Sequence, residues 1–416
     1  MEIIAPKVTN IDNRVVTVKL ERAVRTAYQS YDKITDHSAI GLLRHCFKNR
    51  HLSVFEHHYI QLNLAHAPAI NFNVQKAFYH KYLTIINEEG IISMKGNLRC
   101  FMDIWYNKVH HLMHVLMTES PVDYVLEDDK HNECNELYSS DKKITIIDEF
   151  YFMFGNPDKG TKPVDFSLDF LQKHEEDFAV IQFCMDVFNN VFTDTNEKYI
   201  ALVPNVRVVD NGRTKHFNDC YNNLSGLMSA DTNYYSFEVD TDIGVGREWL
   251  RHAIRGITQE STRYCNYKTK GFKVICPKPF AYAEEFYKVV ESEGRLYPVT
   301  GKAADKLTKE QKQAKLTYMA LDYVNKKYDE LISLGVPPQQ ARIILPLGLK
   351  ATFVITGHWL EWAHFCFMRN ATDAHPQIQI LADEIEKYFR QNLAGKDLDT
   401  FIEVAAGLKL VATVKR

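Results

Sequence analysis

The stretch 248-EWLRHAIRGITQESTRYCNY-267 decides how the rest of the chain is interpreted, because it gathers more arginine, histidine, glutamine and serine than a solvated helix normally carries. We expect it to form a helix and the turn that follows. Guanidinium groups that fork toward an anion, with a hydroxyl group and backbone N–H groups beside them, suit the capture of a phosphate. A buried network of arginine and glutamate is the structural alternative, and this stretch alone leaves both open.

A second arginine-bearing segment follows Pro337-Pro338. There Arg342 opens a helix, and Arg369 lies 27 residues further on, after a long apolar run that ends in aromatic residues and methionine. An unpaired buried charge is costly, so an arginine at the edge of so apolar a segment needs an anionic partner. That partner is either a carboxylate or a bound substrate.

The composition is typical of a globular protein: 416 residues, of which 45% are hydrophobic and 25% charged. The 50 Lys+Arg and 53 Asp+Glu give a net charge of −3, which argues against a protein that coats polymeric nucleic acid. Eight scattered cysteines without a CxxC pair predict a reducing compartment. The first residues do not resemble a signal peptide and no uncharged apolar run is long enough to span a membrane, so we expect a cytoplasmic protein with no membrane partner.

Secondary-structure patterns come in blocks along the chain. Strand patterns cover 15–20, 58–64 and 233–242, and helical patterns cover 36–48, 72–117, 170–192, 246–256, 305–334 and 375–392. The helix over 305–334 has one apolar stripe and ends at Gly335. Blocks rather than strict alternation favour an α+β fold over a doubly wound parallel sheet. The polar, acidic stretch over about 120–170 indicates the exposed part of an insertion.

Three further motifs are weak. GVG (244–246) opens a helix after a strand, but the third glycine of a dinucleotide fingerprint is absent. GNPDKGTK (155–162) has the last two residues of a phosphate loop in reversed order, so we expect a surface turn. His110 and His114 have a spacing that can bind zinc, but no third ligand is near, so we expect no metal.

At the polar stretch quoted first, the sequence resembles the flavin-dependent thymidylate synthases, especially their longer bacterial and phage members. The family signature is Arg-His-Arg, seven residues and Ser. Here it is Arg251-His252-Ala253, seven residues and Ser261, and TQESTRYCNY continues it in the manner of the family's QES-x-RY.

Other blocks of the family occur in the same order along the chain. HLSVFEH (51–57) is similar to the H-x-S/T-x-x-E-H motif. ARIILPLGLK (341–350) and HFCFMRNATDAHPQ (364–377) are similar to the AR-x-x-LP and HF-x-x-LR…AHPQ blocks. The resemblance covers about 1–64 and 233–395.

The resemblance implies an α+β fold, in which a twisted antiparallel sheet is flanked by helices, assembled as a homotetramer with sites at subunit interfaces. It also implies that dUMP is converted to dTMP. The carbon comes from 5,10-methylenetetrahydrofolate and the hydride from reduced FAD, and NADPH reduces the flavin.

Site residues are carried over by motif position. The resemblance implies that dUMP, mostly through its phosphate, is held by Glu248, Arg251, Ser261, Arg263 and Arg342, with Gln259 and Glu260 lining the same pocket. Arg369 is implied to lie against the pyrimidine edge, where a fixed cation stabilises the anion that develops as C5 becomes nucleophilic. No enzyme nucleophile is then required, so Ser261 is interpreted as a binding residue.

The flavin and folate residues follow in the same way. The resemblance implies that FAD is contacted by Ser53, Arg251, His252, Gln259, His358 and His364. It implies that His51 and Glu56 lie toward the flavin and folate face.

The sequence departs from the family pattern at two places. Ala253 replaces the second signature arginine, and His358-Trp359-Leu360 replaces an Asn-x-Arg that meets the flavin. Asn97 and Arg99 supply an Asn-x-Arg pattern elsewhere. We hypothesise that the inserted segment folds back so that these two residues complete the flavin site.

We therefore expect a family domain made of 1–64 and 233–416, with a large, mostly helical insertion over 65–232. The main interpretation is a flavin-dependent thymidylate synthase. Two alternatives stay open: the same fold with altered C5 chemistry on a pyrimidine nucleotide, such as hydroxymethylation, and a non-catalytic nucleotide-binding homologue that has lost flavin.

Overall fold

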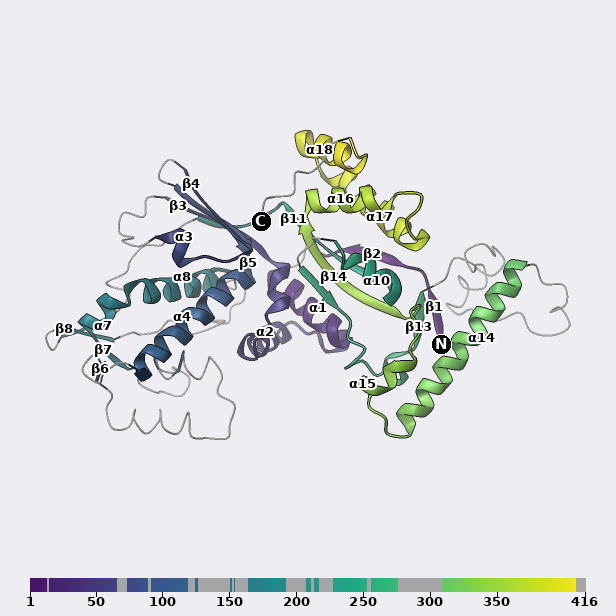
Figure 1. Cartoon of the computed structure of the whole chain (residues 1–416), viewed down its shortest axis with the longest axis horizontal. Helices are drawn as coiled ribbons and strands as arrows, with labels where there is room; N and C mark the ends of the chain where they lie inside the picture. Colours follow the sequence, from purple (N-terminus) through teal and green to yellow (C-terminus); the bar gives the residue numbers. More distant parts are fainter. Residues whose placement is uncertain are drawn as a thin grey trace. The chain divides into compact units, whose positions relative to one another are not determined.

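The structure is a computed structural model, shown in Figure 1. It describes residues 1–12, 15–65, 73–88, 91–118, 124–125, 150–151, 153, 164–191, 207–210, 213–216, 227–252, 256–275 and 309–408. The chain forms two compact units. Unit 1 comprises 1–14, 21–34 and 232–416, and unit 2 comprises 15–20 and 35–231. Residues 35–64, which the sequence analysis assigned to the family domain, thus pack with unit 2.

Unit 1 is built on a four-stranded antiparallel sheet of order β12-β14-β11-β2. The strands are β2 (Lys7–Asn10), β11 (Tyr234–Asp242), β12 (Gly256–Gln259) and β14 (Lys350–His358). Val239 of β11 lies opposite Phe353 of β14, so both side chains point to the same face. That face is apolar.

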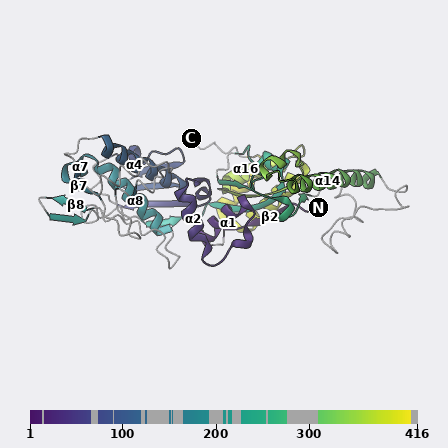
Figure 2. The same ribbon diagram turned by 90° about the horizontal axis from the view of Figure 1, so that it is seen from below.

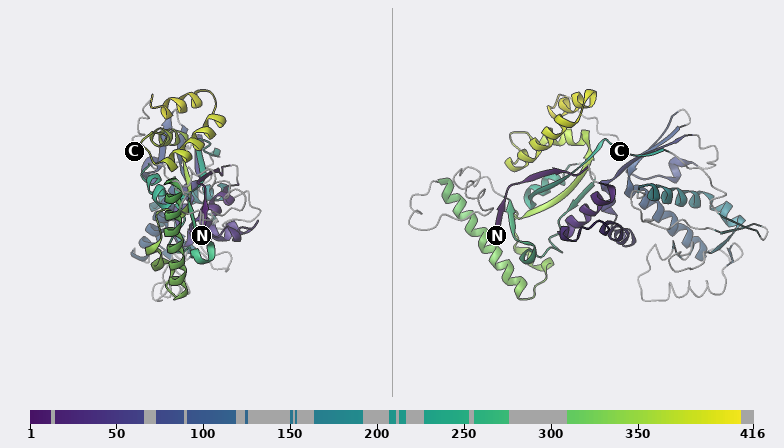
Figure 3. Two further views of the ribbon diagram at one scale, coloured as in Figure 1. Left: turned by 90° about the vertical axis from the view of Figure 1, so that its right-hand side faces the viewer. Right: turned by 180° about the vertical axis from the view of Figure 1, so that it is seen from behind.

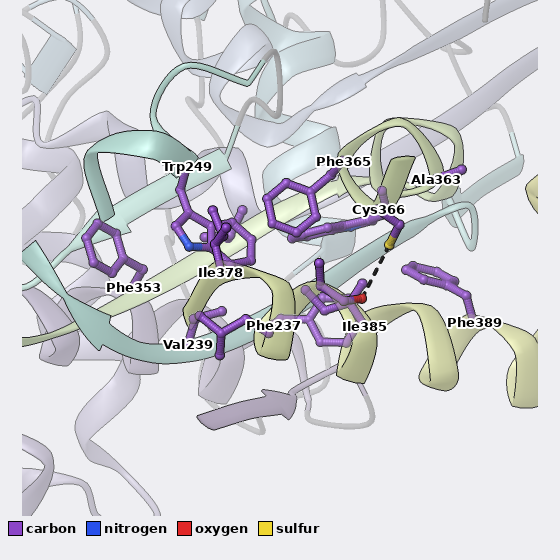
Figure 4. Close-up of a cluster of buried hydrophobic side chains, with 14 of the residues drawn as sticks. Phe237, Val239, Trp249, Phe353, Ala363, Phe365, Cys366, Ile378, Ile385 and Phe389 are labelled. Carbon is purple, nitrogen blue, oxygen red and sulfur yellow. Dashed lines mark hydrogen bonds between the residues drawn. The ribbon is translucent and has the colours of Figure 1, made fainter. Parts of the chain in front are cut away.

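Four helices form the apolar layer of unit 1 together with this face: α10 (Ile243–Trp249), α16 (Trp359–Arg369), α17 (Pro376–Asn392) and α18 (Gly395–Ala405). Figure 4 shows the core between them, where the Trp249 and Phe365 rings stack at 4.1 Å between centroids. Cys366 is fully buried there, and its thiol donates to the Ala382 carbonyl at 3.6 Å. These contacts hold the second half of α16 against α10 and α17.

The opposite face of the sheet is polar and is covered by α1 (Val16–Tyr28). Arg22 of α1 makes a bidentate ion pair with Glu238 of β11 at 2.5 and 2.6 Å. Ala23 packs on Val354 of β14. The strand predicted over 15–20 is therefore wrong: the β-branched residues lower helix propensity only slightly, and burial of one face of the longer segment decides for helix.

The remaining elements of unit 1 pack beside the sheet, where α14 (Lys309–Ser333) runs as one long helix (Figure 2). Gly335 follows it with φ of 84°, a conformation that favours glycine, which confirms the predicted stop. The other elements are β1 (Glu2–Ile4), β13 (Lys273–Ile275), η1 (Tyr31–Lys33), α11 (Tyr267–Lys270), α15 (Pro338–Ala341) and η4 (Arg342–Ile344).

Unit 2 contains an antiparallel sheet of order β10-β3-β5-β4 and two long helices, α4 and α8, that pack side by side (Figure 3). Its elements are α2 (Ser38–Lys48), η2 (Leu52–His57), β3 (Tyr59–Ala65), α3 (Val74–Ala77), β4 (Leu83–Glu88), β5 (Ile91–Asn97), α4 (Leu98–Thr118), α7 (Leu168–Lys173), α8 (Glu175–Val191) and β10 (Leu227–Ala230). A second small sheet contains β6 (Tyr124–Val125), β7 (Asp165–Ser167), β8 (Arg207–Asp210) and β9 (Arg213–His216).

The predicted α+β class with antiparallel sheets is confirmed. The helical pattern over 72–117 is wrong at 83–97, where β4 and β5 pair as antiparallel strands, because both segments carry β-branched residues, which favour strands. The described part of the insertion contains both helices and strands. The turn predicted over 155–162 lies outside the described residues. Within the residues described, no helix is both long and apolar enough to cross a membrane.

Candidate functional site

Arg369, the last residue of α16, is held by three hydrogen bonds. Its Nη1 donates to the Glu248 carboxylate at 2.6 Å, and its Nη2 donates to the Glu248 carbonyl oxygen at 3.1 Å. Its Nε donates to His252 Nε2 at 2.8 Å. The two charged side chains are only 16% and 24% exposed. Arg369, Glu248 and His252, which we name the Arg369 cluster, come from two segments that the sequence analysis assigned to one site, and the structure brings them together.

His252 is neutral in this arrangement. Because Nε2 accepts the hydrogen bond from Arg369, its proton is on Nδ1. Burial lowers the pKa of His252 to about 4, and the charges of Arg369 and His364 act in the same direction. The ring also packs edge-on against Phe365 at 5.0 Å.

Local sequence explains why α10 delivers Glu248 here. Asp242 caps the helix, since its Oδ1 accepts from the Val245 N–H at 2.6 Å. A Cβ at Gly246 would overlap the Phe353 ring, so glycine lets the helix lie close on β14. The GVG motif is therefore a packing feature. The helix predicted over 246–256 is wrong in its bounds, because the cap starts it at 243 and β12 begins at Gly256.

Arg263 and Arg342 form a second group, which we name the exposed arginine pair. Arg342 Nη1 lies 3.5 Å from Thr262 Oγ1, next to Arg263 in sequence. Both arginines are exposed, and the Arg263 guanidinium lies over the Tyr264 ring at 5.4 Å. Ser261, which begins this turn, is fixed by its N–H donating to the Ala27 carbonyl at 3.0 Å. Among the described residues, no hydrogen bond or ion pair joins this pair to the Arg369 cluster.

Glu260 lies in a buried network below that turn. Its carboxylate accepts from Tyr267 Oη at 2.8 Å, from Lys350 Nζ at 3.1 Å and from the Thr352 N–H at 3.1 Å. It is 2% exposed. Burial lowers the pKa of Lys350, but the charges of Glu260 and Asp240 outweigh it and leave that pKa raised. Glu260 therefore anchors the turn that presents Ser261.

The structure separates Gln259 from Glu260, which the sequence analysis put in one pocket. Successive residues of a strand point to opposite faces. Gln259 ends β12 opposite Phe353, whose side chain belongs to the apolar face, whereas Glu260 bonds on the polar face. Sequence patterns alone did not reveal this network, and the signal for it was Lys350 at the start of an apolar strand.

Residues implied to bind flavin have varied environments in unit 1. Arg251 and His364 are exposed. His358 is the N-cap of α16. Its Nδ1 accepts from the Leu360 N–H at 3.1 Å, and its backbone N–H donates to the Glu361 carboxylate at 2.9 Å. The histidine that stands in place of the family's asparagine thus has a capping role.

The other implied flavin and folate residues belong to unit 2. His51 and Ser53 are exposed at the start of η2, and Glu56 is near its end. Asn97 is fully buried, and its Oδ1 accepts from the Cys100 N–H at 3.2 Å. Arg99 is ion-paired with Glu56. His110 and His114, the pair with zinc-like spacing, are both exposed on α4.

The second part of the chain is similar to proteins of a known family. Residues 214–393 match the sequence model of the family described as thymidylate synthase complementing protein. The match contains the Arg369 cluster and the exposed arginine pair.

Curated relatives carry the name flavin-dependent thymidylate synthase. Those from Thermosipho melanesiensis and Thermotoga neapolitana are 27% and 29% identical over 164 and 158 residues. Each alignment covers 38% of this chain, and it covers 63% and 62% of the respective relatives. One from Halobacterium salinarum is 40% identical over 58 residues, or 14% of this chain and 24% of that protein. The chain thus spans less than two thirds of the length of these relatives.

Among solved structures, a UMP/dUMP methylase from Streptomyces cacaoi bound with 5-Br dUMP matches with 20% identity and a TM-score of 0.30. The alignment covers 42% of this chain and 72% of that one. A likeness at this level supports no argument about the site.

Proposed function

We propose that this chain is a flavin-dependent thymidylate synthase. It converts dUMP to dTMP, taking the carbon from 5,10-methylenetetrahydrofolate and the hydride from reduced FAD, with NADPH as the source of electrons. The observation that carries the proposal is the Arg369 cluster, in which two segments far apart in sequence fix one guanidinium group in the family-matched region.

Arg369 acts on the pyrimidine. A preorganised cation at the ring edge stabilises the negative charge that develops as C5 becomes nucleophilic, and its three bonds spare it reorganisation when that charge appears. Glu248 holds the guanidinium, and neutral His252 adds an acceptor without adding a competing positive charge. No covalent enzyme nucleophile is needed, so Ser261 binds and does not attack.

The exposed arginine pair receives the phosphate. Guanidinium groups pair with phosphate oxygens in a bidentate manner, and exposed ones keep their donors available for that purpose. Ser261 supplies a hydroxyl group beside them, and Glu260 fixes the turn from below. Arg251 adds a third exposed cation.

The side chains of unit 1 fit the anionic part of a flavin dinucleotide. Arg251 and His364 are exposed, and His364 is close enough to His252 to influence its pKa. A diphosphate needs guanidinium groups and N–H donors of this kind. When bound, the reduced flavin supplies the hydride, while the residues named here bind and orient the nucleotide.

The family resemblance supports a homotetramer whose sites form at subunit interfaces. The Arg369 cluster and the exposed arginine pair belong to one site in this proposal, and a subunit contact is the means by which they meet. Light scattering of the purified chain measures this directly. A monomer that is fully active would contradict the shared site.

The test is an absorption spectrum of the purified protein with and without added FAD, followed by mass spectrometry of the product. A yellow protein that forms dTMP from dUMP and methylenetetrahydrofolate supports the proposal. A product heavier than dTMP by one oxygen atom indicates hydroxymethylation instead. A colourless protein that binds dUMP by calorimetry but takes up no FAD overturns the enzyme assignment in favour of a nucleotide-binding role.

A further inference from the structure

Unit 2 contains a chain of polar contacts that begins at Glu56 and ends at His80. Glu56 pairs with Arg99 Nη1, and Arg99 Nε donates to Asp103 at 3.2 Å. The His80 Nε2 lies 3.4 Å from the same Asp103 carboxylate. Glu56 belongs to the HLSVFEH motif, whereas the other three residues belong to the segment between the two family-like parts of the chain.

Backbone pairing brings Glu56 and Arg99 close together. The Leu98 N–H donates to the His58 carbonyl at 2.8 Å, and Tyr59 of β3 lies opposite Asn97 of β5. Glu56 precedes the first of these junctions and Arg99 follows the second. The backbone next to each residue is therefore held by the sheet. Arg99 lies in the first turn of α4, which contacts η2.

His80, at the other end of this series of polar contacts, is also held in place. The Tyr82 N–H donates to His80 Nδ1 at 3.2 Å, so that nitrogen is an acceptor and the proton of the neutral ring is on Nε2. Nε2–H then points at Asp103. Asp103 in turn accepts from Arg99 Nε, and the His80 and Asp103 side chains are 14% and 26% exposed.

We propose that Arg99 is a positioning residue that holds the Glu56 carboxylate ionised and oriented, so that the inserted segment controls a residue of the family motif. This role differs from direct flavin contact, because in it Arg99 acts through the Glu56 carboxylate, which it binds through Nη1. The inference rests on the proposed function only for what Glu56 does, since the contact itself needs no ligand.

Electrostatics indicates the direction of the effect. Burial raises the pKa of Glu56, whose side chain is 12% exposed, and Arg99 opposes that shift. The other charged groups that act on Glu56 are Asp103, which raises its pKa, and Lys81, which lowers it. Loss of Arg99 therefore favours the protonated carboxyl group, and loss of Asp103 favours the carboxylate.

The first experiment titrates Glu56 by carbon-13 NMR of glutamate labelled at the side-chain carboxyl group, with E56Q to assign the resonance. We expect the Glu56 titration to move to higher pH in R99Q, to move to lower pH in D103N, and to stay near wild type in R99K. Opposite shifts in R99Q and D103N are not produced by general loosening of the fold. A Glu56 titration that is the same in R99Q as in wild type overturns the proposal.

The second experiment is a double-mutant cycle on FAD affinity, measured by flavin fluorescence with E56Q, R99Q and E56Q/R99Q. If Arg99 acts through Glu56, R99Q weakens FAD binding in the wild-type background and adds less than twofold in the E56Q background. Equal losses in both backgrounds would make Arg99 a direct flavin ligand and end the positioning role. If no variant binds FAD but Glu56 titrates as expected, the proposed function fails while the role of Arg99 stands.

Discussion

The Arg369 cluster and the exposed arginine pair use the same side chain in opposite ways. Arg369 donates from all three of its nitrogens to protein atoms and is half-buried. Arg263 and Arg342 are exposed, and the contact of Arg342 is a 3.5 Å approach to a hydroxyl group. An arginine whose N–H donors are already bonded to protein suits a charge that develops during a reaction, because its position is fixed. An arginine with free N–H donors suits binding of a charged phosphate.

The largest effect is expected from E260Q, which removes the charge under the turn that presents the exposed pair. Lys350 would keep only Asp240 at 3.4 Å as its carboxylate partner. Breaking a buried ion pair from one side costs about 3–5 kcal/mol, so the urea midpoint should fall sharply. The control is E386Q, on a half-buried carboxylate of α17 that pairs with Arg390 and accepts from Asn370 at 2.6 Å. Equal midpoints for E260Q and E386Q would contradict an anchoring role.

R369A should then reduce kcat by about 10²–10³-fold, the usual loss when one preorganised donor is removed. The nucleotide KM should change much less, because the proposal assigns the phosphate to the exposed arginine pair. The rate of dTMP formation measures this. R390A is the matched arginine control on the next helix, with its own partner Glu386 at 2.5 Å. A KM effect without a kcat effect would reverse the roles of the two arginine groups.

R342A should have the opposite signature, with KM for dUMP raised about tenfold, or about 1.4 kcal/mol, and kcat nearly unchanged. Because the group is exposed, the effect should shrink as ionic strength rises. Steady-state kinetics at two salt concentrations tests both points. A salt-independent KM in the wild type would count against phosphate capture by exposed charges.

H358A should cost about 1 kcal/mol of unfolding free energy, because the N-cap of α16 is lost. H358N should retain stability, since asparagine is also a preferred cap. Denaturation curves of the two variants separate a capping role from a site role. Equal destabilisation by both substitutions would show that the imidazole, rather than the cap, is what matters.

A pH-dependent effect is expected at His252. Its folded pKa of about 4 lies below the unfolded value near 6.5, so its contribution to stability is complete above about 6.5 and falls as pH decreases toward 4. NMR titration of the His252 ring should give a midpoint near the folded value. H252Q should flatten this part of the stability profile. A midpoint near 6.5 would mean that the ring is not held as an acceptor of Arg369.

Sequence periodicity correctly predicted helices and strands that bury one face and expose the other. The helix expected over 375–392 is α17 (Pro376–Asn392), and the strand expected over 233–242 is β11. The prediction for 15–20 was wrong. Its β-branched residues indicated a strand, but burial of a longer segment makes it part of α1. Local pattern does not contain that tertiary information.

Motif order predicted that Arg369 and Glu248 share a site, and the structure joins them. It did not predict that Gln259 and Glu260 face opposite sides of the sheet, which depends on strand register. It also did not predict the partners of Arg99, since a contact between the inserted segment and the HLSVFEH motif depends on how β3 pairs with β5.

The thiol of Cys366, which is buried against α17, can serve as a probe of local opening. Burial raises its pKa well above the ordinary value and raises that of Cys265, also in unit 1, to about 12. Cys46, Cys100 and Cys184 are buried in unit 2. Thiolate is the reactive form, so an alkylating reagent attacks each sulfur only when its surroundings open. Alkylation rates read by peptide mass spectrometry would therefore time the opening of each unit separately within one intact chain.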